Sequence, residues 1–174
     1  MADKKTGRRI HDEKRYGHFI TFSCYRKARL LGHERARGIV IHYLSEQLKN
    51  QNGECMGFVV MPNHVHALVR FEETGKLSTF MSQWKRRSSM GLKKLLKEVL
   101  IEDGKHVDLE SPVWQRRHYS FEVYSKAKAI EKIDYMHWNP VKAGLVDEPE
   151  EWRQSSARWF LGGKPVGVLL TKAL

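Results

Sequence analysis

The stretch FVVMPNHVHALVRF, residues 58–71, is the most informative part of the sequence for the fold. From His64 onward its residues alternate in character, as they do in a β-strand whose successive side chains point to opposite faces. One face would hold His64, His66, Leu68 and Arg70, and the other, assigned to the core, would hold Val65, Ala67, Val69 and Phe71. Same-face residues lie roughly 6.6 Å apart, so the two imidazoles can converge on one metal ion. The spacing alone also fits two histidines that bond to carboxylates on a sheet face.

Further elements surround this strand in the chain. Residues 17–24 and 55–60 have the character of strands. Pro62-Asn63 predicts a turn, so residues 55–60 and the histidine strand would form an antiparallel hairpin. Apolar residues at helical intervals predict helices over 36–48, 77–100 and 124–138, the last ended near Asn139 by Pro140. A short fourth strand is predicted over 113–118. The order β-α-β-β-α-β, followed by a further helix, predicts an α+β ferredoxin-like split fold, with an antiparallel sheet and two helices on one face.

The charge balance points to a polyanionic partner. The 174 residues include 31 Lys and Arg against 20 Asp and Glu, a formal net charge of +11, which favours nucleic acid or an acidic membrane surface. No apolar run approaches the length of a membrane span, and the charged first residues do not form a signal peptide. Cys24 and Cys55 have no paired metal or redox spacing, so we expect reduced thiols in a cytoplasmic protein that contacts no membrane.

The length is that of a single domain. We expect a basic N-terminal arm over residues 1–15, the domain itself over 16–160 and a C-terminal tail over 161–174. Cationic side chains for DNA are expected on the long helix, on the fourth strand and on the last helix: Lys85, Arg86, Arg87, Arg116, Arg117, Lys128 and Lys132. Trp84, Trp114 and Trp138 are candidates either for base stacking or for the core.

The helix of residues 124–138 carries a tyrosine away from its apolar side. At about 100° per residue, the apolar sector would hold Ala127, Ile130, Ile133 and His137, and the opposite side would hold Lys128, Lys132, Tyr135 and Asn139. Residues four apart share one helix face, so Tyr135 and Asn139 can reach the same point. An amphipathic surface tyrosine is the alternative, and by residue type alone Tyr16, Tyr119 and Tyr124 are rival nucleophiles.

Three motifs in order then resemble one family. They are MPNHVH at residues 61–66, WQRR at 114–117 and DYMHWNPVKAGLV at 134–146. Together they closely resemble the REP-associated tyrosine transposases, members of the single-tyrosine HUH transposase group, over about residues 16–160. The resemblance implies that His64 and His66 are metal ligands, that Tyr135 on a C-terminal catalytic helix is the nucleophile, and that Asn139 is the third, amide-type ligand.

The same resemblance implies an activity. Single-stranded DNA beside a REP-like hairpin would be cleaved and rejoined by transesterification, through a 5′-phosphotyrosine at Tyr135. Nitrogen and oxygen ligands suit Mg²⁺ or Mn²⁺, with Zn²⁺ as an alternative. Asn rather than Gln at position 139 favours the REP-associated branch, for which a monomer is expected and a homodimer is the alternative. The protein would act on the nucleoid in the cytoplasm.

Three other functions stay open at this point. A hairpin-DNA binding regulator could keep the transposase fold with little catalysis, although it would not need the nucleophile and the ligands together. The sheet could instead bind RNA, but its strands lack the aromatic pattern of RNA-recognition domains. A metal hydrolase that activates water would leave no protein–DNA adduct.

Overall fold

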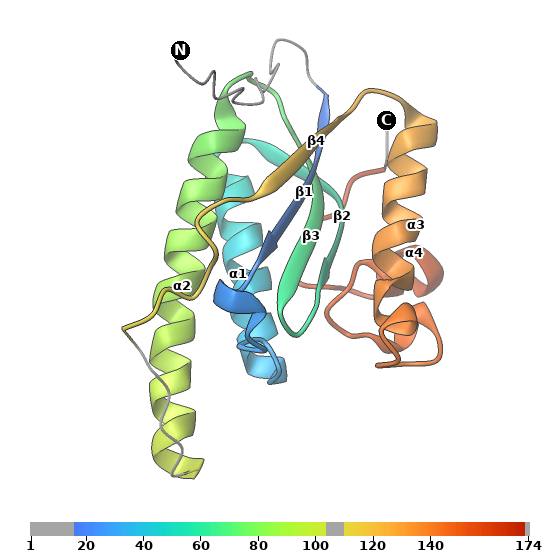
Figure 1. Cartoon of the computed structure of the whole chain (residues 1–174). Coiled ribbons are helices and arrows are strands. Elements are labelled where there is room, and N and C mark those ends of the chain that lie inside the picture. Colours follow the sequence, from blue (N-terminus) through green and yellow to red (C-terminus); the bar gives the residue numbers. More distant parts are fainter. Residues whose placement is uncertain (1–15, 104–109, 173–174) are drawn as a thin grey trace, which may run out of the picture.

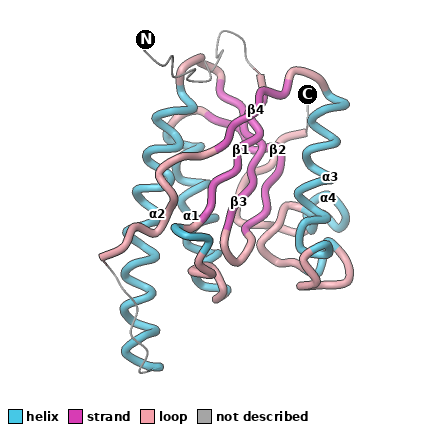
Figure 2. The backbone as a smooth tube through the Cα atoms, viewed as in Figure 1, coloured by secondary structure: helices cyan, strands magenta, loops and turns pink. Residues whose placement is uncertain are grey.

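The computed structural model describes residues 16–103 and 110–172, so the predicted basic arm over 1–15 lies outside the described residues. The elements follow one another as shown in Figures 1 and 2: β1 (Gly17–Ser23), η1 (Tyr25–Lys27), α1 (Glu34–Asn50), β2 (Gly53–Val60), β3 (His64–Phe71), α2 (Lys76–Asp103), β4 (Tyr119–Val123), α3 (Lys126–Lys142), η2 (Pro149–Glu151) and α4 (Ala157–Gly162).

The four strands form one antiparallel sheet in the order β2-β3-β1-β4. The predicted hairpin of β2 and β3 is confirmed, and β1 lies beside the histidine strand. In the register of β1 and β3, Thr21 is opposite His66 and Ser23 is opposite His64. The central position of β3 therefore gives both histidines a neighbouring strand that can supply hydrogen-bond partners.

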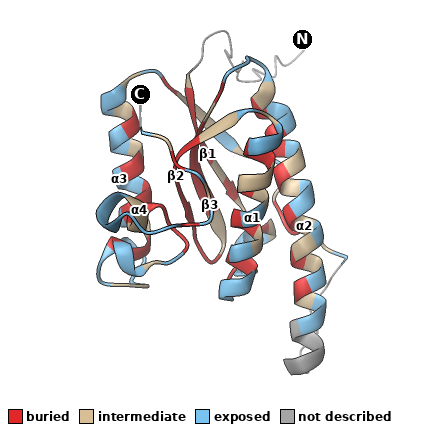
Figure 3. Ribbon diagram, turned by 180° about the vertical axis from the view of Figure 1, so that it is seen from behind, coloured by how far each residue is buried: buried red, intermediate tan, exposed pale blue. Residues whose placement is uncertain are grey.

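The two faces of the sheet are covered by different helices (Figures 1 and 3). On one face, α1 and α2 pack over Val65, Ala67 and Val69, in the large cluster that also contains Trp84 and Trp114. On the other face α3 packs over a smaller cluster that holds Phe19, Met56, Leu68, Ile133 and Met136. The predicted α+β fold, with two helices on one face and a further helix at the histidines, is confirmed.

The fourth strand was predicted one segment too early. Over 113–118 the chain makes a single bridge, between Trp114 and Cys24, and the strand is instead Tyr119–Val123, which pairs with β1. The ammonium group of Lys85 donates hydrogen bonds to the carbonyl oxygens of Gln115 (2.6 Å) and Arg116 (3.1 Å). These carbonyl groups are turned toward α2, which interrupts the pairing and delays the regular ladder.

The prediction that Pro140 ends the last helix was also wrong. Pro140 lies inside α3, which continues to Lys142. The end is a Schellman motif: the Gly144 N–H donates to the Val141 carbonyl (2.9 Å) and the Leu145 N–H to the Pro140 carbonyl (3.0 Å). Gly144 has a φ of +67°, which glycine adopts at no steric cost. Since Pro140 is buried, packing offsets the hydrogen bond that its missing N–H forfeits.

The buried side of α3 is turned slightly from the prediction. Ile133 and His137 are buried as expected, but Ala127 and Ile130 are exposed, and Ala129 and Met136 take their places. Gly57 on β2 explains this difference, because Met136 and Ile133 pack directly against its backbone. A Cβ atom at this position would lie only 3.0 Å from Cε of Met136 and 3.2 Å from Cγ1 of Ile133. The glycine lets α3 approach the sheet along this side.

The C-terminal segment covers the free edge of β2. Ser155 forms an isolated bridge with Val59, and Leu170 forms one with Cys55. Val166 and Leu170 are buried in the α1/α2 cluster, so the predicted tail packs on the domain. Among the described residues, no helix is long and apolar enough to cross a membrane.

Candidate active site

His64 and His66 lie side by side on β3, on the face that α3 covers. Their ring centroids are 4.8 Å apart and the rings are nearly perpendicular, at 79°. His66 is buried, with 5% of its surface exposed, and His64 is half-buried at the start of the strand. The alternation predicted from the sequence therefore brings the two imidazoles together.

A hydrogen bond orients each imidazole. Thr21 Oγ1 lies 2.7 Å from Nδ1 of His66, and Asn63 Oδ1 lies 2.7 Å from Nδ1 of His64. When Nδ1–H of each ring donates to these oxygens, the lone pair of each Nε2 is left available. Partners of this kind set the tautomer and direction of metal-binding histidines.

Asn139 reaches the same point from the last turn of α3. Its Nδ2 lies 3.4 Å from Nε2 of His66, and its side chain also forms a hydrogen bond with His64. Rotation of the amide by half a turn presents its oxygen to the same place. Continuation of the helix past Pro140 is what keeps Asn139 in position, so the error in the predicted helix end matters for the site.

Both histidines are held in the neutral form. Burial lowers the pKa of His66 to about 3, with further contributions from His64 and the charge of Lys132. Burial also lowers the pKa of His64; its hydrogen bond with Asn139 opposes this effect and the charge of Lys27 adds to it. Neutral imidazole is the form that binds metal ions.

Tyr135 lies beside this group and keeps 43% of its surface exposed. Its ring centroid is 5.4 Å from that of His66 and 6.1 Å from that of Phe19. The ammonium groups of Lys132 and Lys142 lie 5.9 Å and 5.8 Å from the centre of its ring. A partly exposed tyrosine ring thus has two cations and His66 around it.

A buried hydrogen-bond network fixes α3 to β2. The Ser156 hydroxyl donates to the Phe58 carbonyl (3.1 Å) and accepts from the Phe58 N–H (2.9 Å), and Nε2 of His137 lies 2.8 Å from the same hydroxyl. Burial lowers the pKa of His137 to about 4. Because His137 lies between Tyr135 and Asn139 in sequence, this network positions both of their side chains.

The residues predicted to bind DNA fall into two groups. Lys132 lies in the site, with its ammonium 5.0 Å from the centre of the Phe19 ring, and Lys128 pairs with Glu131 nearby at 2.7 Å. Lys85 instead holds the segment after α2 through its two bonds to carbonyl oxygens. The exposed side chains of Arg86, Arg87, Arg116 and Arg117 lie on α2 and on this segment, which the sheet separates from α3.

The aromatic candidates separate in the same way. Trp84 and Trp114 belong to the core, whereas Trp138 is 45% exposed. Tyr16 and Tyr124 pack against each other at 6.0 Å, at the end of β1 away from the histidines. Tyr119 is opposite Thr21 in the register of β1 and β4, so among the rival nucleophiles it is the one nearest to the site along the sheet.

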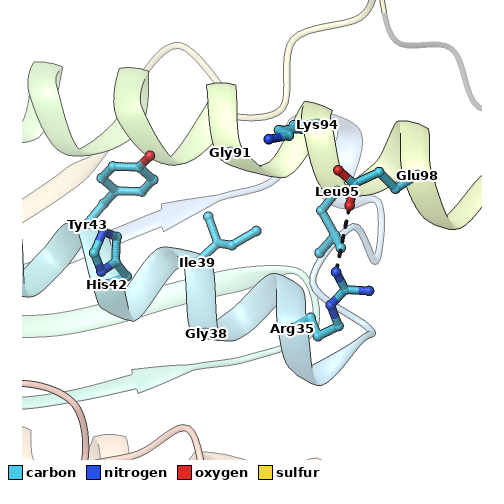
Figure 4. A pocket seen from close by; sticks show the side chains of 9 residues that line it. All are labelled: Arg35, Gly38, Ile39, His42, Tyr43, Gly91, Lys94, Leu95 and Glu98. Atoms are coloured by element: carbon cyan, nitrogen blue, oxygen red, sulfur yellow. Dashed lines mark ion pairs between the residues drawn. The ribbon is translucent and has the colours of Figure 1, made fainter.

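A separate pocket lies between α1 and α2 (Figure 4). It has a volume of about 490 Å³ and is lined by Arg35, Ile39, Tyr43, Lys94 and Glu98, among others. Arg35 and Glu98 form an ion pair across it at 3.7 Å. The sheet separates this pocket from His66 and Tyr135, so the pocket is not part of the candidate active site.

Several residues of the site were missed in the sequence. Thr21, Phe19 and Lys142 contact the histidines or Tyr135, and Asn63 orients His64. Thr21 could not be found without the register of β1 against β3. Asn63 had a usable signal, because a side-chain amide directly before a candidate ligand can bond to that ligand's ring.

The donor set fits a divalent ion. Within residues 16–103 and 110–172, no three His, Cys, Asp or Glu side chains gather into a metal-binding group. An ion at this place would have to be held by two imidazole nitrogens and the Asn139 amide, a nitrogen and oxygen set that suits Mg²⁺, Mn²⁺ or Zn²⁺. The hydrogen-bonded Nδ1 atoms and the neutral rings agree with such use.

The fold and the site place the chain among α+β proteins whose sheet presents a histidine pair to a tyrosine on a packed helix. The family described as "Transposase IS200 like" matches residues 12–137, and the chain belongs to this family. A protein of Haemophilus influenzae with the provisional name REP-associated tyrosine transposase is 26% identical over 104 residues, which are 59% of this chain and 58% of that relative. The chain thus matches little more than half of that relative's length.

Solved structures agree with the fold. A REP-associated tyrosine transposase bound to a REP hairpin superposes with a TM-score of 0.67 and 20% identity, over 98% of this chain and 93% of the other. A protein of Deinococcus radiodurans R1, provisionally named a transposase, gives a TM-score of 0.50 and 16% identity, over 68% of this chain and 86% of the other. The resemblance predicted from the sequence is confirmed.

Proposed function

We propose that this protein is a metal-dependent transposase that cleaves and rejoins single-stranded DNA beside REP-like hairpins through a 5′-phosphotyrosine at Tyr135. The observation that supports it best is the convergence of His64, His66, Asn139 and Tyr135. A protein that only binds DNA has no need of this set. One chain supplies all four residues, so we expect a monomer to suffice for cleavage.

His64, His66 and Asn139 would hold the divalent ion, with Mg²⁺ or Mn²⁺ preferred. When bound, such an ion polarises a phosphate oxygen as a Lewis acid. Thr21 and Asn63 would keep the two imidazoles aimed at it, because their oxygens occupy the Nδ1–H groups. The chain thereby provides two fixed imidazole ligands, and only the Asn139 amide would need to turn to present its oxygen.

Tyr135 would carry out the strand cleavage. Its hydroxyl oxygen loses a proton and forms a bond to the scissile phosphorus, while the bond from phosphorus to the 3′ oxygen breaks and that oxygen leaves with a proton as a 3′-hydroxyl. The number of phosphoester bonds is unchanged, so another 3′-hydroxyl can reverse the step and join strands without ATP. Lys132 and Lys142, which flank the ring, would attract the phosphate.

Binding of the substrate would draw on the positive charge of the chain. Lys132 lies beside Tyr135, and Lys128, which precedes it on α3, places its ammonium 5.9 Å from the centre of the Phe121 ring. Both would contact the single strand near the cleaved bond. Arg86, Arg87, Arg116 and Arg117 form a separate exposed group that would contact the hairpin. The structural relative is described as bound to a REP hairpin, which supports this choice of substrate. We expect this protein to act in the nucleoid.

The test is denaturing gel electrophoresis after incubation with labelled single-stranded hairpin DNA and Mn²⁺. We expect a covalent protein–DNA band that is absent with Tyr135→Phe and unchanged with Tyr119→Phe, the matched control on the same sheet face. A chelator should remove the band. Binding without any band, across several flank designs, would favour a regulatory hairpin-binding protein instead.

A further inference from the structure

The turn that follows β1 presents a cluster of cations that the proposed function has not used. Arg26, Lys27 and Arg29 are exposed side by side in the segment from Tyr25 to Arg29. Throughout the part of the chain that the structure describes, none of the three has a carboxylate partner. By contrast, Lys128 pairs with Glu131.

The backbone of this turn is strained. Arg26 has a φ of +52° and Lys27 a φ of +55°, in the left-handed region that long side chains rarely adopt. Among the described residues one other non-glycine has a positive φ, Asn52, and asparagine is a residue type that tolerates this region. Two successive non-glycine residues in this conformation lower stability, and backbone strain of this kind clusters at ligand-binding and active sites.

Hydrogen bonds at both ends hold the turn in this shape. The Tyr25 N–H donates to the Val113 carbonyl (2.8 Å), and the Leu31 N–H donates to the Pro62 carbonyl (2.9 Å). Within the turn, the N–H of Lys27 donates to the Cys24 carbonyl at 3.0 Å. The turn is thus fixed relative to the sheet, and its cations extend from a defined place.

That place is next to the histidine pair. The Asn63 side chain bonds to both elements: its Oδ1 lies 2.7 Å from Nδ1 of His64, and its Nδ2 lies 3.5 Å from the carbonyl oxygen of Lys27. The charge of Lys27 is also felt at His64, whose pKa it helps to lower. In Figure 1 the turn lies beside the β2–β3 connection, with α3 on the other side of the sheet.

We propose that Arg26 and Lys27 form a second phosphate-binding element of the active site, which holds a backbone phosphate of the substrate strand on the side of His64 away from Tyr135. This inference rests on the proposed function and extends it. The strand would be held at two points, by Lys132 and Lys142 beside the nucleophile and by the turn beyond the metal ligands. The fixed geometry of the turn would set the direction in which the strand crosses His64.

Two substitutions at Lys27 separate charge from backbone strain. Lys27→Gln removes the charge and keeps a side chain in the strained conformation, whereas Lys27→Gly removes the charge and relieves the strain. Asn52→Gly is the control for the backbone, and Lys49→Gln is the control for an exposed charge. Both controls lie near the junction of α1 and β2, where Gly53 is paired with Phe71, at the end of β3 away from His64.

The measurement is fluorescence anisotropy of a labelled DNA hairpin with a single-stranded flank, over a range of salt concentrations. Removal of one cation that neutralises a phosphate lowers the salt slope by about 0.7 for a single strand. We expect this decrease and several-fold weaker binding for both Lys27 variants, but not for the two controls or for a hairpin without the flank. The melting temperature of Lys27→Gly should equal or exceed that of the unaltered protein.

The outcomes separate this inference from the proposed function. Lys27 variants with an unchanged salt slope, in a protein that still forms the covalent band, overturn the phosphate-binding turn alone. A lowered slope without any covalent band in the unaltered protein supports the turn and contradicts the transposase chemistry. If the unaltered protein does not bind the flanked hairpin, both proposals fail.

Discussion

The two faces of the sheet are built from the same strands but hold their neighbours in different ways. Toward α1 and α2, β3 presents Val65, Ala67 and Val69, which are fully buried in a large apolar cluster. Toward α3 it presents His64 and His66, which are held by hydrogen bonds to Asn63 and Thr21 and to Asn139. We therefore expect one face to supply most of the stability and the other to supply the chemistry, so that the two respond differently to mutation.

The largest effect on stability is expected on the α1/α2 face. Trp84 is completely buried, and its ring centroid lies 4.8 Å from that of Phe22. Its indole N–H donates a hydrogen bond to the Val40 carbonyl (2.9 Å). Trp84→Ala should lower the free energy of unfolding by about 3–5 kcal/mol, because a large cavity replaces the ring. Urea denaturation measures this loss. The matched control is Trp138→Ala, on the exposed side of α3, which should cost under about 0.5 kcal/mol.

The division between the two faces would break down if Trp84→Ala removed activity from the protein that remains folded. The covalent band, expressed per folded molecule, should be close to that of the unaltered protein. A cost similar to that of Trp138→Ala would show that this face is not the main source of stability.

The next largest effect is expected from the hydrogen bond between Thr21 and His66, whose loss should lower activity and change stability little. Thr21→Val keeps the shape of the side chain and removes the oxygen that accepts from Nδ1–H of His66. Loss of such a partner costs about 10–100-fold in metal affinity or activity, while the free energy of unfolding should fall by only about 1 kcal/mol. Manganese titration calorimetry and the rate of covalent band formation measure the two consequences.

Thr21→Ser is the conservative variant for this position. It restores a hydroxyl group at the same place, so it should recover most of the metal affinity. If Thr21→Val binds Mn²⁺ as tightly as the unaltered protein, the hydrogen bond does not orient His66.

The smallest effect, taken per histidine and per pH unit, is a pH dependence of stability that comes from the α3 face. The pKa values of His66 and His137 are lowered to about 3 and about 4 in the folded chain, whereas an unfolded histidine titrates near 6.5. Between these values the unfolded state binds more protons, so stability falls as the pH is lowered. Each histidine should contribute a decrease of about 1.4 kcal/mol per pH unit below roughly 6.

Thermal or urea unfolding at several pH values, with a chelator present, measures this slope. His137→Gln should reduce the slope by the share of one histidine, since glutamine does not titrate. Stability that stays constant from about pH 6.5 to about pH 4.5 would contradict burial of neutral histidines at this face.

Much of the contrast between the faces was contained in the sequence of β3. The alternation of Val65, Ala67 and Val69 with His64 and His66 predicts both faces, because side chains of a strand alternate with a period of two. The same local logic placed Tyr135 on the accessible side of its helix. Patterns of short range therefore sufficed for the two faces of β3, whereas the roles proposed for Tyr135 and Asn139 depended on the resemblance to a family.

The errors came from interactions between distant parts of the chain. The ammonium of Lys85 displaces the fourth strand, and the packing of Met136 against Gly57 turns α3. Thr21 became a partner of His66 only through the register of β1 and β3. The left-handed turn at Arg26 and Lys27 depends on bonds to Val113 and Pro62, which no local pattern reveals.

In the proposed mechanism, Tyr135 becomes covalently linked to DNA beside the histidine pair. The most direct measurement is to trap the product formed with hairpin DNA and Mn²⁺, digest both components and identify the nucleotide-bearing peptide by mass spectrometry. We predict a 5′-phosphate ester on Tyr135 and a free 3′-hydroxyl on the released strand. A link to Tyr16, Tyr119 or Tyr124, or cleaved DNA with a free 5′-phosphate and no protein attached, would contradict this account.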